Sequence, residues 1–166
     1  MMIQTEILIK APANRVWEIL TDFNSFPQWN PFIVSIQVIS GDLSSSSSSS
    51  SPATLKVILE PNGPSSQSIF TPKVVKWEPA KEFAWLGSIG GSSSTWAIFT
   101  GEHHFKLEEI ILPEDGSVVT KFSHFENFGG WLAKPLLFFI GNQTKAGFQK
   151  MNIALKKRAE EQSSSS

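Results

Sequence analysis

The N-terminal part of the chain combines one strand pattern with two helical patterns. Residues 3–10 alternate apolar and polar side chains, which predicts a strand with one buried face. Pro12 then suits a first helical turn, where its missing N–H is not needed. The predicted helix places its apolar residues on one face: Val16, Ile19, Leu20 and Phe23. A second, shorter helical turn is predicted for residues 24–29.

Apolar and polar residues alternate with a period of two through most of the middle of the chain. Such alternation predicts strands that bury one face and expose the other. The predicted strands are residues 32–38, 55–59, 69–77, 83–87, 99–111 and 117–128. The last two are joined by residues 113–116, which contain Asp115-Gly116, and Asp-Gly between alternating hydrophobic residues is a strong hairpin signal.

After Gly129-Gly130 the pattern becomes helical again. Apolar residues return along one face at helical spacing: Leu136, Ile140, Phe148, Met151 and Leu155. They predict a helix over residues 131–161, in which Pro135 kinks the helix or ends a looser first turn. This order of elements does not fit βαβ alternation. We therefore predict an α+β fold, with two short helices after the first strand and a curved antiparallel sheet of about seven strands around the long C-terminal helix.

The chain is predicted to form one domain. Its 166 residues are enough for one hydrophobic core and short for two. We assign residues 1–162 to this domain. Serine runs have nothing to bury, so we predict a flexible serine-rich loop at residues 44–51 and a disordered tail at residues 163–166.

Several segments resemble a known superfamily. They are IKAPANRVWEILTDF at residues 9–23, FPQWNPF at 26–32, GEHHFKL at 101–107, ENFGG at 126–130 and GFQKMNIALK at 147–156. Together they resemble the START-like, Bet-v-1-like (SRPBCC) superfamily, in particular its polyketide cyclase/dehydratase and lipid-transport branch. The resemblance spans nearly the whole chain and implies a helix-grip fold with a hydrophobic ligand cavity. It implies no single activity, because members include lipid carriers, hormone sensors, allergens, cochaperone-type modules and a few cyclases.

The composition favours an apolar interior or pocket and disfavours several classes of function. The chain has 13 Phe and 6 Trp but no Tyr, and large side chains without hydroxyls suit an apolar interior or pocket. A formal net charge of −1 provides no excess of positive charge with which to bind nucleic acid. The absence of cysteine excludes disulfides, thiolate nucleophiles and cysteine-bound metals. No phosphate-binding glycine loop or zinc-binding helix motif is present, so we expect no cofactor and no metal.

Two segments are the candidates for a signal peptide and for a membrane span. Residues 1–10 lack the continuous apolar core of a signal peptide, and residues 131–140 are too short and too interrupted for a membrane span. We therefore expect a cytoplasmic protein without a transmembrane segment. The apolar run 136–140 is richer than a helix lying on one sheet requires, and it predicts either transient membrane contact or a buried turn.

All three histidines lie on the predicted long hairpin, and the alternation of side chains along each strand predicts which of them point inward. If the turn is centred between Glu114 and Asp115, facing residues have numbers that sum to 229: Leu107 with Phe122, Phe105 with His124, and His103 with Glu126. When Phe105 and Leu107 point inward, so do His103, His124 and Glu126. His104 then points outward with Glu102 and Lys106, as an ordinary surface residue.

An inward histidine beside an inward carboxylate suits acid–base chemistry, so His103 and Glu126 are the candidate catalytic pair. Two other interpretations remain open: the two groups satisfy each other as buried polar side chains, or they anchor a ligand. The candidate ligand-binding residues are the inward or apolar ones near the expected cavity, for which plain core packing is the alternative. They are Trp17, Trp29, Val34, Ile36, Leu55, Val57, Trp85, Phe105, Phe122, His124, Leu136 and Ile140.

Three functions from different classes fit these patterns. The first is binding or carriage of a small hydrophobic molecule, such as a lipid, an isoprenoid or an aromatic polyketide, in an internal cavity. The second is a cyclase or dehydratase that uses His103 and Glu126 for proton transfer. The third is a cochaperone-like interaction module, whose cavity would be filled by its own Phe and Trp side chains.

Overall fold

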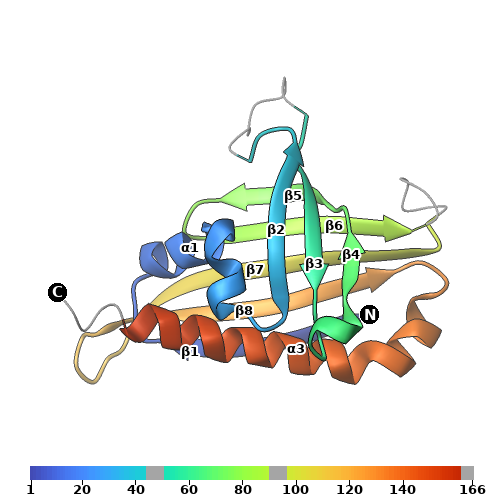
Figure 1. Cartoon of the computed structure of the whole chain (residues 1–166). Helices are drawn as coiled ribbons and strands as arrows, with labels where there is room; N and C mark the ends of the chain where they lie inside the picture. Colours follow the sequence, from blue (N-terminus) through green and yellow to red (C-terminus); the bar gives the residue numbers. More distant parts are fainter. Residues whose placement is uncertain (44–50, 90–96, 162–166) are drawn as a thin grey trace.

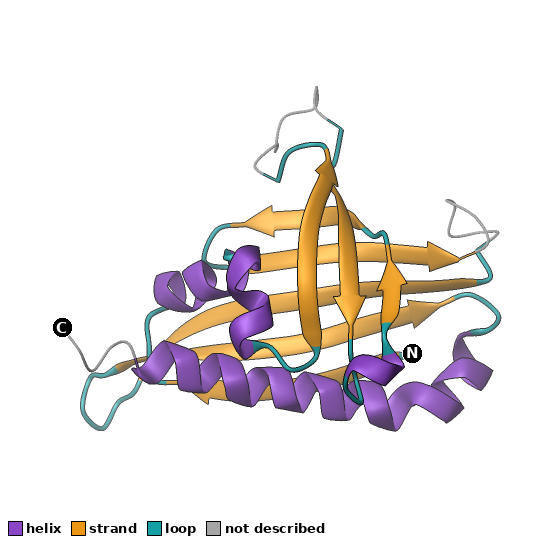
Figure 2. Cartoon of the chain, in the orientation of Figure 1, coloured by secondary structure: helices purple, strands orange, loops and turns teal. Residues whose placement is uncertain are grey.

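The computed structural model describes residues 1–43, 51–89 and 97–161. The predicted serine-rich loop, except Ser51, and the predicted tail lie outside the described residues. Within them the predicted α+β helix-grip architecture is confirmed: a curved antiparallel sheet holds a long C-terminal helix, as Figures 1 and 2 show.

The helices follow the predicted order. The first strand leads into α1 (Ala13–Thr21), a 3₁₀ turn (Phe23–Ser25) and the short α2 (Phe26–Trp29). A second 3₁₀ turn spans Pro64–Ser66, and the chain ends in α3 (Ala133–Glu161). Pro135 lies in the first turn of α3, where its missing N–H leaves no intrahelical hydrogen bond unmade.

Eight described strands form one sheet. They are β1 (Met2–Ile9), β2 (Ile33–Ser40), β3 (Thr54–Leu59), β4 (Ser68–Phe70), β5 (Lys73–Glu78), β6 (Glu82–Ile89), β7 (Phe99–Ile111) and β8 (Val118–Gly129). Seven of them are ordered β1-β8-β7-β6-β5-β3-β2, and β4 pairs with β3 beside this path. The pairs are all antiparallel.

One predicted strand, residues 69–77, is two strands in the structure. Pro72 separates β4 from β5, because proline has no N–H to continue the ladder. The Pro72 carbonyl still accepts a hydrogen bond from the Leu55 N–H at 2.9 Å. The break lets β4 pair with the C-terminal part of β3, while β5 pairs with its first residue, Thr54.

The sheet bends so that its two ends lie on different sides of the core. Figure 1 shows β2, β3 and β4 running steeply across the direction of β6, β7 and β8, with α3 along the lower edge. The C-terminal half of α3 packs against this curve through Phe148, Met151 and Leu155, each fully buried. Gly147 allows the Phe32 ring to lie directly on the helix, since a Cβ there would overlap the ring.

Two groups of buried apolar residues result. The larger one surrounds Phe83, Phe105, Phe122 and Phe148 and includes most of the sheet. The smaller one, Phe128, Ala133 and Leu137, joins the first turns of α3 to the end of β8. The middle of α3, between these two groups, faces the candidate site.

Candidate functional site

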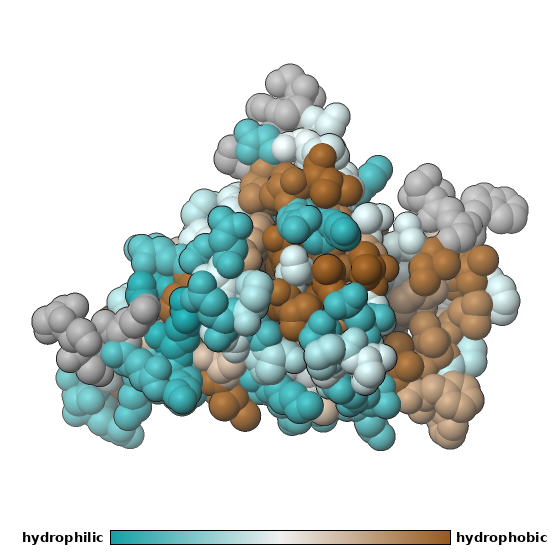
Figure 3. Space-filling view, in the orientation of Figure 1, coloured by the Kyte–Doolittle hydropathy of each residue, from teal (hydrophilic) through white to brown (hydrophobic). Residues whose placement is uncertain are grey.

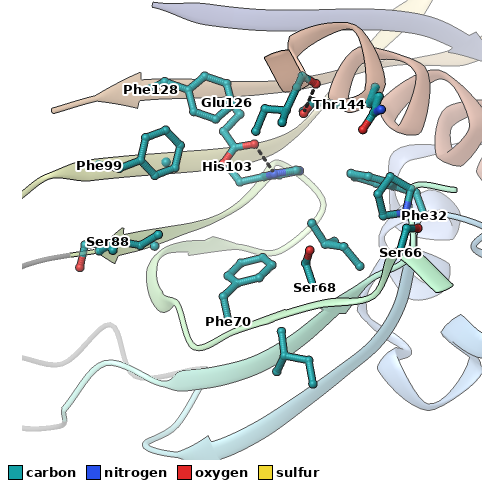
Figure 4. A pocket seen from close by; sticks show the side chains of 18 of the residues that line it. Phe32, Ser66, Ser68, Phe70, Ser88, Phe99, His103, Glu126, Phe128 and Thr144 are labelled. Atoms are coloured by element: carbon teal, nitrogen blue, oxygen red, sulfur yellow. Dashed lines mark hydrogen bonds and ion pairs between the residues drawn. The ribbon is translucent and has the colours of Figure 1, made fainter. Parts of the chain in front are cut away.

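A cavity of about 630 Å³ lies between the two apolar groups. Figure 4 shows it bounded by the ends of β6, β7 and β8, by the β3–β4 region and by the middle of α3. Its wall mixes aromatic and aliphatic side chains with small hydroxyl residues and two titratable groups. The apolar part of the wall consists of Phe32, Leu59, Pro61, Ile69, Phe70, Ile89, Phe99, Phe128 and Ile140. Ile69 and Ile89 are 56% and 62% exposed, which places the mouth beside them.

The titratable groups of the wall are His103 and Glu126, and the hairpin places them together. β7 and β8 pair in the predicted register, so that Leu107 faces Phe122, Phe105 faces His124 and His103 faces Glu126. That part of the sequence prediction is confirmed. His103 Nδ1 lies 3.3 Å from Glu126 Oε2. His103 is 4% exposed, whereas the Glu126 side chain keeps 18% of its area accessible, on the cavity side.

Behind this pair, a line of polar side chains runs through the apolar core. His103 Nε2 lies 2.7 Å from His124 Nε2. His124 Nδ1 lies 2.9 Å from Asn152 Oδ1, and the Asn152 amide donates to the Thr5 hydroxyl at 3.0 Å. Thr5 in turn donates to the His124 carbonyl at 3.3 Å. This polar chain, Glu126–His103–His124–Asn152–Thr5, connects β8, β7, α3 and β1, and its members behind Glu126 are all buried.

Gly101 makes room for the carboxyl group. It lies on β7 two residues before His103, on the same face, and a Cβ at this position would collide with Glu126 Oε1. Glycine inside a strand often marks such a close approach. Any larger residue would push the carboxyl group away from His103 or into the cavity.

Burial keeps both members of the pair uncharged. It raises the pKa of Glu126 to about 8, and with a smaller contribution from His104 it lowers the pKa of His103 to about 3. Burial also holds the pKa of His124 well below its usual value, although hydrogen bonds to Asn152 and to the Phe148 backbone act in the opposite direction. At neutral pH the pair therefore consists of a carboxylic acid and a neutral imidazole rather than an ion pair.

Among the described residues that line the cavity, none besides His103 and Glu126 is titratable. Opposite Glu126, β1 contributes Ile3, and α3 contributes Ile140, Gln143 and Thr144 to the wall. Among the described residues, no group of three or more His, Asp or Glu side chains is arranged to hold a metal ion.

The structure distributes the sequence-predicted ligand residues over three environments. Only Ile140 joins His103 and Glu126 on the wall of this cavity. The second environment is the core, where the buried members are Ile36, Leu55, Val57, Trp85, Phe105, Phe122 and His124. The third is its edge, with the half-buried Trp17, Trp29, Val34 and Leu136.

His104 lies on the outer face of the sheet, as predicted, but it is not an ordinary surface residue. Its ring stacks on Phe125 with centroids 4.4 Å apart, and its Nδ1 lies 2.7 Å from Glu82 Oε1. Its side chain is only 13% exposed. The outer face thus has its own buried polar contact, separated from the cavity by the sheet.

Sequence reasoning missed Asn152, Thr5 and Gly101. Asn152 had a readable signal, because Phe148, Met151 and Leu155 place it on the apolar face of the helix, where a buried amide needs partners. Gly101 interrupts an alternating strand, which is the usual sign of close approach. Thr5 carries no such signal, since threonine is common in strands.

Because the pKa of Glu126 is raised, we predict that the wild type loses stability at alkaline pH. The variant Glu126→Gln should not show this loss. The folded protein holds this proton up to about pH 8, whereas the unfolded chain releases it near 4.5. The unfolded state then binds fewer protons, so the free energy of unfolding falls as pH rises through this window. Buried histidines act in the opposite direction, but only below about 6.5.

Urea denaturation between about pH 7 and pH 9 separates the two effects. The free energy of unfolding should fall by about 1 kcal/mol or more in the wild type and stay flatter in Glu126→Gln. Glu102→Gln, on the outer face of β7, is the matched control and should follow the wild type. Parallel curves for wild type and Glu126→Gln would show that Glu126 is already ionised at neutral pH.

Comparison with known proteins places these features in a family. The family model for "Polyketide cyclase / dehydrase and lipid transport" matches residues 2–160. No curated protein sequence gave a significant match.

Solved structures resemble the whole chain. One is a START superfamily protein from Mycobacterium smegmatis, with a TM-score of 0.61, 18% identity and coverage of 96% of this chain and 97% of that chain. Another is the Zhui aromatase/cyclase from Streptomyces sp. R1128, with a TM-score of 0.58, 13% identity and coverage of 96% and 93%. A hypothetical protein from Helicobacter pylori has a TM-score of 0.66, 16% identity and coverage of 96% and 88%. At identities this low the likeness concerns the fold. The family match over nearly the whole length shows that the chain belongs to the polyketide cyclase/dehydrase and lipid-transport family.

Proposed function

We propose that this protein binds or carries a small hydrophobic molecule, such as a lipid, an isoprenoid or an aromatic polyketide, in the cavity beside His103 and Glu126. The observation that carries the proposal is the cavity itself: about 630 Å³, with a wall surface that is mainly apolar and with two titratable groups among the described residues that line it. Ligand pockets for small molecules typically have this volume and a mainly apolar surface with a few polar groups that orient the ligand.

The cavity also weighs against an interaction module with a vestigial cavity. Such a module would fill the space between sheet and helix with its own Phe and Trp side chains. Here the large aromatic residues Trp85, Phe105 and Phe148 pack in the core, and the volume between Phe32, Phe70 and Phe128 stays open. Leaving an apolar volume open forfeits packing energy, which a bound ligand would restore.

A cyclase or dehydratase is the second candidate, and the Glu126–His103 contact favours it. A carboxylic acid with a pKa near 8, at a cavity wall, would donate a proton to a leaving hydroxyl group once its O–H turned from the neutral imidazole of His103 to the substrate. The Streptomyces neighbour is named an aromatase/cyclase.

Exposed aromatic residues near the cavity support a proposal of transient membrane contact. Trp131, Phe138 and Phe139 are 73%, 85% and 76% exposed. Figure 3 shows apolar side chains gathered where α3 begins. These three residues, which we name the aromatic lip, would let an apolar ligand pass from a bilayer to the mouth without crossing water. No helix in the described part of the chain is both long and apolar enough to span a membrane.

Filling the cavity should abolish ligand binding while the fold is kept. Gly87 lies on the wall, and a Cβ there would meet Phe70 at an ordinary 3.8 Å. Gly87→Phe should therefore project a ring into the cavity and weaken binding of the uncharged dye N-phenyl-1-naphthylamine at least about tenfold. Leu86→Phe, at the adjacent position of β6 with opposite parity, is the matched control and should bind normally. Equal dye affinity in both variants would place the ligand elsewhere.

The enzyme candidate predicts a large effect of Glu126→Gln on turnover. A β-hydroxyketone such as 4-hydroxy-4-phenylbutan-2-one would lose water to give a conjugated ketone, which is followed by ultraviolet absorbance. Glu126→Gln should lower this turnover by about 10²- to 10⁴-fold, the usual effect of removing a positioned proton donor, and leave dye binding within about threefold. A wild type that binds the hydroxyketone without dehydrating it would favour the carrier.

The aromatic lip predicts membrane contact that depends on its exposed rings. The double variant Phe138→Ser and Phe139→Ser should reduce co-sedimentation with phosphatidylcholine vesicles about fivefold or more, because aromatic rings supply most of the interfacial affinity of such a surface. Ile153→Ser removes a 63% exposed apolar residue from the same helix outside the lip and is the control. If the double variant sediments like the wild type, the lip does not contact the bilayer.

A further inference from the structure

The polar chain has a direction, which fixes the proton on each of its members. The Thr5 hydroxyl donates to the His124 carbonyl and accepts from the Asn152 amide nitrogen. Asn152 therefore presents its oxygen to His124, and His124 carries its hydrogen on Nδ1. Its bare Nε2, 2.7 Å from His103 Nε2, requires the hydrogen of His103 to be on that nitrogen.

This leaves His103 Nδ1 without a hydrogen, and Glu126 Oε2 lies 3.3 Å from it. A carboxylate would place a negative oxygen beside that bare nitrogen, whereas a carboxylic acid places its O–H there. If every hydrogen bond of the polar chain ran the other way, His103 Nδ1 would carry a hydrogen and Glu126 would be a carboxylate. That carboxylate would have one N–H neighbour and no cation, in a site where an unpaired charge is costly. The raised pKa of Glu126 agrees with the first direction.

The second carboxyl oxygen is consequently an acceptor without a partner. Oε1 lies over Gly101, at the wall, and no described residue forms a hydrogen bond with it. If the single hydrogen of the protonated carboxyl group is on Oε2, the oxygen beside the bare Nδ1 of His103, Oε1 can only accept. A ligand that satisfies this oxygen must bring a donor.

The described wall offers no cation to an anion. No Lys or Arg is among the described residues that line the cavity, and residues 44–50, 90–96 and 162–166 contain neither by sequence. Two wall hydroxyls already donate to the backbone: Ser66 to the Gly63 carbonyl at 2.8 Å and Thr144 to the Ile140 carbonyl at 3.1 Å. A carboxylate in this cavity would be buried without a counter-charge.

We propose that the cavity selects uncharged molecules that carry a hydroxyl group, an alcohol or a phenol, which donates to Glu126 Oε1, and that it discriminates against carboxylates such as fatty acids. This inference rests on the proposed binding function and specifies its ligand class. His124 and Asn152 act as positioning residues, since they fix the tautomer of His103 and through it the side of Glu126 that remains open to the ligand.

Three naphthalenes of nearly equal size test the selection by displacing N-phenyl-1-naphthylamine at about pH 6.5, where a phenol is neutral and a carboxylic acid in water is ionised. In the wild type, 2-naphthol should bind about tenfold more tightly than 2-methylnaphthalene, and 2-naphthoate should bind more weakly than both. In Glu126→Leu the advantage of naphthol over methylnaphthalene should shrink to about threefold or less, because the acceptor is gone.

Glu126→Gln gives the sharpest result. Its amide has the hydrogen-bonding pattern of the protonated acid, with an N–H for His103 and an oxygen for the ligand, so the preference for naphthol should persist. Glu102→Leu, which removes a carboxylate from the outer face of β7, is the control and should leave all three affinities unchanged. Loss of the preference in Glu126→Gln would show that an ionised Glu126 is the true acceptor and would overturn the inference.

The experiment distinguishes failure of the selection for hydroxyl groups from failure of the proposed binding function. If the dye binds but naphthol shows no advantage, or naphthoate binds equally well, the selection is refuted and the carrier function stands. If neither the dye nor any naphthalene binds, the function is refuted and the inference with it. Should Glu126→Leu not fold, infrared spectroscopy gives an independent answer. The wild type should show a protonated-carboxyl band that is absent in Glu126→Gln and shifts with 2-naphthol but not with 2-methylnaphthalene; absence of the band overturns the inference.

Discussion

The hydrogen bond between Asn152 and His124 is the contact on which the rest of the site depends. It joins the long helix to the middle of the sheet inside an aromatic core, where an amide or an imidazole without a partner would cost about 1–3 kcal/mol. Sliding α3 by one turn would break this bond and leave both groups buried and unsatisfied. The apolar side chains around it tolerate many arrangements, whereas the polar pair accepts one, so it fixes the position of the helix.

From this fixed point the position of the cavity follows. The turns of α3 around Asn152 are held against the sheet, and the first turns are held by the contact of Ala133 and Leu137 with Phe128. The sheet curves between these two attachments, because β2, β3 and β4 cross the direction of the longer strands, as Figure 1 shows. A straight helix cannot follow that curve, and the wall beside it is formed by small side chains such as Ser68, Gly87 and Thr144. The cavity thus results from the curve of the sheet beside the helix, and small residues at these positions keep it open.

The sequence predicted the parts of this arrangement that depend on local rules. Alternation and the Asp115-Gly116 turn set the parity and register of β7 and β8, which is why the contact of His103 with Glu126 could be predicted. Pro72 shows the limit of periodicity, since the pattern continued through a residue that divides the strand. The cavity wall was harder to predict because inward apolar residues such as Leu55 and Phe122 look alike whether they fill the core or line a cavity. Only the distance between helix and sheet distinguishes these cases, and it is a property of the whole fold.

The electrostatics of the cavity disfavour proton transfer from Glu126 to His103. Burial raises the pKa of Glu126 and lowers that of His103, so moving the proton from the carboxyl group to the imidazole would create two charges in an apolar site. Behind His103 the polar chain closes on itself through Thr5 and the His124 carbonyl, and it offers no ionised group to stabilise an imidazolium. A serine-protease triad places a carboxylate behind its histidine for that purpose; here the corresponding position holds a second neutral imidazole. The imidazole of His103 is therefore a weak base, and the other oxygen of Glu126 is left facing the cavity.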